Sequence, residues 1–137
     1  MSRLMLFVFL FFLNFISFAQ KEKEDEYLKN LAKKIQFENK ELYFKEGSLE
    51  AMKDVVHYIN SNEGYYLITS NTSLNGSANA NQKLTSFRAK MIKRLMVNLG
   101  VDSLKIRVAG LGENYPISSH PSKEDDRIEI TVYEKKK

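Results

Sequence analysis

The chain has 137 residues, which is enough for one folded domain and too few for two well-buried cores. It contains no cysteine and only two histidines, which excludes thiol catalysis, disulfides, thiolate metal sites and histidine-rich metal sites. The formal net charge of +4 is small, and no strand or helix interleaves basic with aromatic residues, so nucleic acid is excluded as a partner. We expect no cofactor.

Residues 1–19 have the composition of a secretory signal peptide. Arg3 is their only charge, an apolar run follows from Leu4 to Leu13, and Ser17 and Ala19 are the small residues that precede a cleavage site. The alternative is an uncleaved membrane anchor, but the run is shorter than the ~20 residues that a spanning helix needs. We therefore expect an exported chain that is cleaved after Ala19.

Residues 20–32 are dominated by charge and are predicted to be a spacer. The domain itself is predicted to span residues 33–134, followed by a basic tail at 135–137. It opens with a short alternating strand at 35–37. Ser48 has the residue type of an N-cap, and apolar residues at helical spacing after it predict a helix over residues 49–60.

A predicted strand at 65–69 leads into a polar loop from Asn71 to Ser77, where turn-forming residues leave amides and hydroxyls free to face a ligand. The next segment has the longest apolar stripe in the chain and predicts a helix from about residue 78 to 99. The stripe consists of Leu84, Phe87, Met91, Ile92, Leu95, Met96 and Leu99. Alternating residues then predict strands at 104–108 and 128–132.

The predicted order is therefore strand, helix, strand, helix, strand, strand. Both helices are amphipathic on one side only, as is typical of helices that cover a single face of a sheet. The sequence predicts an α+β fold, a two-layer sandwich with two helices on one face of a mixed sheet. Each strand, helix, strand unit should cross over right-handed and leave its strands parallel.

Few residues are candidates for chemistry. His57 and His120 have no carboxylate or hydroxyl at a spacing that indicates a relay, and we interpret both as surface residues. Asp125 and Asp126 could be a metal or acid/base pair. Because adjacent residues at a strand entry point to opposite faces, we expect a solvated pair instead.

Arg88 differs from the other cations of its predicted helix because it lies beside the apolar stripe, between Phe87 and Ala89. A guanidinium near the helix start and the preceding loop suits bidentate binding of a carboxylate. The alternative is an arginine that fastens the loop backbone or a strand carbonyl. The pattern alone leaves both open.

Two motifs together resemble a known family. Residues 81–89 read Asn-x-x-Leu-Thr-x-x-Arg-Ala, and residues 110–117 read Gly-x-Gly-Glu-x-x-Pro-Ile. Their order and spacing are similar to those of the OmpA C-terminal-like family, of the OmpA/MotB type, over about residues 32–133. The resemblance implies a periplasmic or outer-membrane-associated domain that is not an enzyme and that binds the diaminopimelate-bearing stem peptide of peptidoglycan non-covalently.

The chain departs from the family pattern at the ligand loop. In the family this loop reads Gly-His-Thr-Asp, and its Asp acts with the helix Arg on the zwitterionic head of diaminopimelate. Here the four positions are occupied by Ser70, Asn71, Thr72 and Ser73, while the Arg is Arg88. The usual Asn-Arg-Arg before the last strand is also changed, to Asp125-Asp126-Arg127. Loss of one charge-assisted bond costs ~1.5–3 kcal/mol.

Two hypotheses follow. In the first, the protein binds peptidoglycan, with Arg88 on the peptide carboxylate and neutral hydrogen bonds from the remaining site residues. These are Asn71, Thr72, Ser73 and Asn81. In the second, it is an envelope scaffold that has lost this ligand and contacts outer-membrane or other envelope proteins. An enzyme is disfavoured because no nucleophile, base and orienting group occur together.

Overall fold

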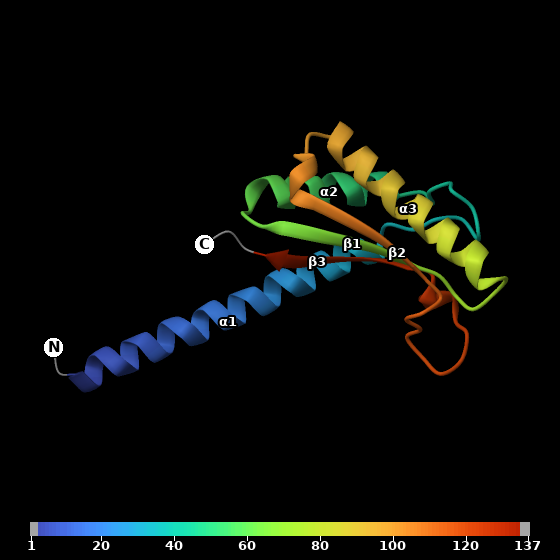
Figure 1. Ribbon diagram of the computed structural model, residues 1–137. Coiled ribbons are helices and arrows are strands. Elements are labelled where there is room, and N and C mark those ends of the chain that lie inside the picture. Colours follow the sequence, from blue (N-terminus) through green and yellow to red (C-terminus); the bar gives the residue numbers. More distant parts are fainter. Residues whose placement is uncertain (1–2, 135–137) are drawn as a thin grey trace.

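The computed structural model describes residues 3–134, which form three helices and one three-stranded sheet (Figure 1). In chain order the elements are helices α1 (Arg3–Lys33) and α2 (Ser48–Ser61), strand β1 (Tyr65–Asn71), helix α3 (Ala78–Asn98), and strands β2 (Ile106–Gly112) and β3 (Arg127–Glu134). Two 3-10 turns, Ser103–Lys105 and Lys123–Asp125, come directly before β2 and shortly before β3. The predicted basic tail at 135–137 lies outside the described residues.

The sheet has the order β2-β1-β3, with β1 parallel to β2 and antiparallel to β3. Figure 1 shows α2 and α3 together on one face, whereas α1 runs out from the opposite side, beneath β3. The predicted class, an α+β two-layer sandwich with two helices on one face of a mixed sheet, is confirmed. The parallel pairing across the β1-α3-β2 crossover is confirmed as well.

The core lies between the helices and the sheet. Its central side chains are Met52, Val55 and Ile59 from α2, Tyr66 and Ile68 from β1, Ile92 and Met96 from α3, Ile106 from β2, and Ile128 and Ile130 from β3. Burial of each aliphatic side chain contributes about 1.5–3 kcal/mol. This apolar contact fixes how the two layers sit on each other.

Helix α3 lies directly on β2 at one glycine. A Cβ atom added to Gly110 would lie 2.2 Å from the backbone nitrogen of Ser86, which no real side chain tolerates. Gly110 is therefore needed for the close approach that places the first half of α3 over the end of the sheet.

The predicted strand at 35–37 is wrong. Phe37 forms only an isolated bridge with Phe44, outside the three-stranded sheet. The backbone of this segment pairs with residues just downstream: Lys45 N donates to Gln36 O at 2.9 Å and Glu38 N donates to Tyr43 O at 2.8 Å. Because backbone groups of residues 36–45 form hydrogen bonds with one another in a local loop, the segment does not extend the sheet.

Ser48 is not the N-cap of α2, which is Gly47 at a φ of 83°. The Ser48 side chain points back instead, because its hydroxyl accepts from Gln36 N at 3.0 Å and donates to Gln36 O at 2.9 Å. It therefore fastens the start of the 36–45 loop to α2.

Residues 20–32, predicted to be a spacer, are helical, and their C-terminal end packs on the domain. Leu28, Leu31, Ala32 and Ile35 are buried in the core at a spacing of three, one and three residues. The surrounding charges obscured this helical stripe in the sequence. Cleavage after Ala19 stays a prediction, and none of the helices among residues 3–134 has the length and apolarity required to cross a membrane.

Candidate binding site

The inner face of α3 is polar over its first half. Asn81, Thr85 and Arg88 are buried at a spacing of four and three residues, which places them on one face of the helix. The predicted apolar stripe is correct farther along, at Ile92 and Met96, but Phe87 is 58% exposed. The buried surface at the start of α3 is therefore built to hold polar groups, with Ser77 capping the helix through Ala80 N.

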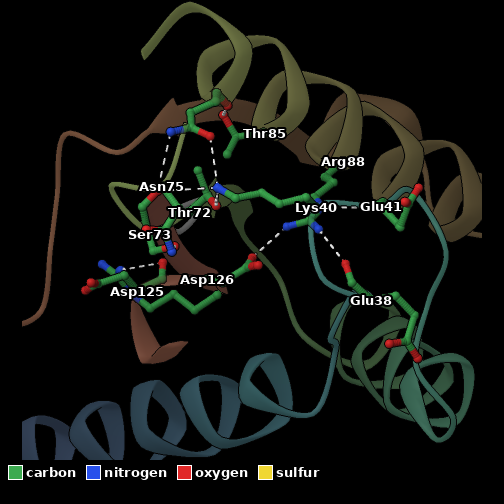
Figure 2. Close-up of polar contacts among 12 residues, drawn as sticks. Glu38, Lys40, Glu41, Thr72, Ser73, Asn75, Thr85, Arg88, Asp125 and Asp126 are labelled. Carbon is green, nitrogen blue, oxygen red and sulfur yellow. Dashed lines mark hydrogen bonds and ion pairs between the residues drawn. The ribbon is translucent and has the colours of Figure 1, made fainter. Parts of the chain in front are cut away.

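Arg88 lies at the centre of this polar face and is fully buried. Its Nε and Nη2 atoms donate to the carbonyls of Glu41 (3.0 Å) and Glu38 (2.9 Å), and its Nη1 donates to Asp126 Oδ1 (2.6 Å) (Figure 2). The guanidinium carbon lies 4.6 Å from the centre of the Phe37 ring. Burial lowers the pKa of Arg88, and the charge and hydrogen bond of Asp126 oppose that shift. Arg88 thus fastens the 36–45 loop, and not the loop before α3 that the sequence pattern indicated.

Asp125 and Asp126 are not a solvated pair, so that prediction is wrong. Asp125 is buried, with its carboxylate accepting from Ile117 N at 2.7 Å and Ser122 N at 2.9 Å. These backbone hydrogen bonds hold the pKa of Asp125 below its usual value. Asp126 turns the other way and forms the ion pair with Arg88 (Figure 2).

The loop after β1 supplies a second group of buried polar residues. Asn71, Thr72 and Ser73 are between 1% and 8% exposed. Thr72 N donates to Gly112 O at 2.9 Å, which fastens the loop to the end of β2. Asn81 Nδ2 donates to Ser73 O at 3.4 Å and to the Glu113 carboxylate, so α3 and the loop after β2 close around the same point.

The side chain of Lys40 enters this group from the 36–45 loop, as Figure 2 shows. Its Nζ donates to Asn81 Oδ1 at 2.9 Å, Thr72 Oγ1 at 3.0 Å and Ser73 O at 3.4 Å. All three acceptors are neutral oxygens. Burial lowers the pKa of the Lys40 ammonium and the Arg88 charge adds to this, whereas Asp126 and Glu113 raise it.

The structure brings together three of the five predicted site residues. Thr72, Ser73 and Asn81 converge on the Lys40 ammonium, while Arg88 lies two turns farther along α3. The buried Asn71 side chain has no hydrogen-bond partner among the described residues. Sequence reasoning missed Lys40 and Asp126, whose partners are more than thirty positions away along the chain.

The charged and polar groups of this arrangement are of types that can bind a charged ligand. Neutral oxygens bind the Lys40 ammonium, and the Arg88 guanidinium forms an ion pair with the Asp126 carboxylate. His57 and His120 are exposed, as predicted. Within residues 3–134 no cluster of three or more His, Cys, Asp or Glu residues could hold a metal ion.

Comparison with protein families gives one match, the model described as the OmpA family, over residues 36–129. That range contains both loops, α3 and Asp126. No curated protein matches this chain.

Solved structures share the fold at low sequence identity. The peptidoglycan-associated lipoprotein from Burkholderia pseudomallei is 19% identical with a TM-score of 0.63, over 74% of this chain and 88% of that chain. The OmpA-like domain of FopA1 from Francisella tularensis subsp. tularensis SCHU S4 is 23% identical with a TM-score of 0.64, over 74% and 73%. The cell wall anchor of the T6SS from Pseudomonas aeruginosa is 18% identical with a TM-score of 0.63, over 73% and 76%.

Proposed function

Because this chain belongs to the OmpA family, we propose that it binds peptidoglycan non-covalently in a bacterial cell envelope, through the diaminopimelate residue of the stem peptide. The names of two structural neighbours, a peptidoglycan-associated lipoprotein and a cell wall anchor, are consistent with this proposal. The protein acts as a binding domain and not as an enzyme. Its signal peptide exports it to the periplasm, where it associates with the wall and with outer-membrane or other envelope proteins.

One observation carries the proposal: the site already binds an alkylammonium group. Thr72 Oγ1, Asn81 Oδ1 and Ser73 O accept three hydrogen bonds from the Lys40 ammonium. A diaminopimelate side chain ends in an ammonium and a carboxylate on one carbon. The same oxygens would accept from that ammonium at roughly 1.5–3 kcal/mol for each charge-assisted hydrogen bond.

Arg88 is the residue that takes the ligand carboxylate. It is fully buried, whereas the side chain of its partner Asp126 is 24% exposed. A ligand carboxylate can therefore reach Arg88 from the Asp126 side, in exchange for the Asp126 carboxylate. Asn71, which has no hydrogen-bond partner among the described residues, supplies a further neutral donor and acceptor.

Sedimentation with purified peptidoglycan sacculi tests this function. The wild-type protein should pellet with sacculi, and Arg88→Ala should abolish pelleting. Because Arg88 also holds the 36–45 loop, Arg88→Lys serves as a second variant that keeps the charge and loses the bidentate geometry. Arg94→Ala, an exposed arginine on the same helix, is the matched control. Wild-type protein that stays in the supernatant at micromolar concentrations would contradict the proposal.

A second candidate function, an envelope scaffold that has lost the ligand, is favoured by one observation. Arg88 is buried with bonds to Glu38, Glu41 and Asp126, and so is already engaged without a ligand. In this case Ser73→Asp should create sacculus binding that the wild type lacks. The variant should be combined with Lys40→Met, because a carboxylate introduced at Ser73 would otherwise lie close to the Lys40 ammonium. Wild-type binding that Ser73→Asp leaves unchanged would eliminate the scaffold as a candidate function.

A further inference from the structure

We propose that Lys40 is a built-in competitor of the ligand: its ammonium occupies the ammonium-binding position of the site and is displaced by the amine of the incoming peptide. This inference rests on the proposed function and names a residue that sets the affinity and selectivity of the same site. It is carried by three hydrogen bonds and by the burial of the groups that accept them.

The acceptors form an ammonium site that Lys40 completes. Thr72 and Asn81 are 3% and 2% exposed, and each turns a side-chain oxygen toward Nζ at 3.0 or 2.9 Å. A buried oxygen without a donor costs free energy, so these two positions require an ammonium, a water molecule or another donor. A different donor can replace the Lys40 ammonium, because the acceptors belong to α3 and the loop after β1, whereas Lys40 belongs to the 36–45 loop.

Lys40 is held in a way that favours displacement. Its backbone has a φ of 54°, the left-handed region that residues other than glycine rarely adopt. It lies in the 36–45 loop among exposed neighbours, and is itself only partly buried. A free ligand ammonium would make the same bonds, and the nearby carboxylates of Asp126 and Glu113 would attract either cation.

The effect of this competition on the affinity for the ligand can be calculated. A ligand that needs an empty position binds with its intrinsic affinity reduced by the fraction of molecules in which the position is free. If Lys40 occupies the position in about nine molecules of ten, its removal strengthens binding about tenfold. Ligands that carry no amine would not displace Lys40 and would gain little from its removal. Lys40 thus selects for peptides with a primary amine.

The first experiment tests the ammonium position without peptidoglycan. Lys40→Ala removes three methylenes and the ammonium, and n-propylammonium has the size of the missing group. We expect propylammonium chloride to raise the melting temperature of Lys40→Ala above that of the same variant in sodium chloride at equal ionic strength. Wild type and Lys45→Ala, an exposed lysine in the same loop, should show no such difference. Equal melting temperatures for Lys40→Ala in the two salts would overturn the proposal.

The second experiment measures displacement by calorimetric titration with a soluble stem tripeptide that ends in diaminopimelate. Lys40→Met, which keeps most of the aliphatic stem, should bind about tenfold more tightly than wild type. Lys45→Met should equal wild type. Equal affinities of wild type and Lys40→Met would overturn the proposal and leave the proposed function standing. Absence of binding by both, together with propylammonium rescue of Lys40→Ala, would contradict the proposed function and support the ammonium position.

Discussion

The two halves of α3 cover the same sheet with opposite chemistry. Toward its C-terminus, Ile92 and Met96 are buried among apolar side chains. Toward its N-terminus, Asn81, Thr85 and Arg88 are equally buried, but their polar atoms hold the 36–45 loop, the loop after β1 and the end of β2. One half of the helix therefore fixes the layers, and the other half organises the loops that form the candidate site.

The largest expected effect on stability is that of Arg88→Ala. The substitution leaves the Asp126 carboxylate and the carbonyls of Glu38 and Glu41 without their donor, which should cost about 3–5 kcal/mol. Urea unfolding followed by circular dichroism measures the loss, with Arg94→Ala expected within about 0.5 kcal/mol of wild type. A loss below about 1 kcal/mol for Arg88→Ala would show that the polar half is not held together by this residue.

A substitution in the apolar half of α3 should lower the stability of the protein without changing the binding of the folded fraction. Met96→Ala opens a cavity in the core and should cost about 2–5 kcal/mol. The fraction that stays folded should bind sacculi like wild type, because Met96 lies in the apolar core about two turns beyond Arg88. Pelleting normalised to the folded fraction checks this, and a loss of binding by folded Met96→Ala would break the division between the two halves.

A smaller effect is expected at Thr85, which joins the polar half to the sheet. Its hydroxyl accepts from the buried Gly112 N at 2.9 Å. Thr85→Val leaves that donor without an acceptor, which should lower the free energy of unfolding by about 1–3 kcal/mol. Thr131→Val, at an exposed position on β3, is the matched control and should be nearly neutral. Equal unfolding midpoints for the two variants would show that the hydroxyl contributes nothing.

The smallest expected effect is a pH dependence from Asp125, beside the Arg88 partner. Its folded pKa is lowered by hydrogen bonds from Ile117 N and Ser122 N. The stability that it contributes is therefore complete above the unfolded pKa of about 3.9 and is lost as the pH falls through the lower folded pKa. The difference in unfolding free energy between wild type and Asp125→Asn should narrow on acidification below about pH 4. A difference that stays constant down to about pH 2 would contradict this role.

The sequence was sufficient for the fold where periodicity was clean. The stripe of α2 and the alternation of β3 come from residues whose spacing alone predicts their burial. It failed where local pairing or charge hid the pattern. The backbone groups of residues 36–45 form hydrogen bonds with one another and not with the sheet. The buried Leu28 and Leu31 are surrounded in the sequence by the charged residues of α1.

The candidate site was predictable only in part. Arg88 and Asn81 stand in a motif of one helix, so a family resemblance identifies them. Lys40 and the pairing of Asp126 with Arg88 were not found. Lys40 and its partner Asn81 are 41 residues apart, Asp126 and Arg88 are 38 apart, and no periodic pattern links such positions. Phe87 was wrongly assigned to the apolar stripe. It is 58% exposed, because the polar residues beside it are the ones that face inward.

We propose that the polar half of α3 and the loops that it holds form a binding site for an amine-bearing stem peptide. Two-dimensional ¹⁵N–¹H NMR of the protein during titration with the diaminopimelate tripeptide tests it most directly. We expect the amide signals of Lys40, Thr72, Ser73 and Asn81 to shift together and saturate, while those of Ile92 and Met96 shift little. No shift at any of the first four amides under saturating peptide, or shifts confined to other surfaces, would contradict it.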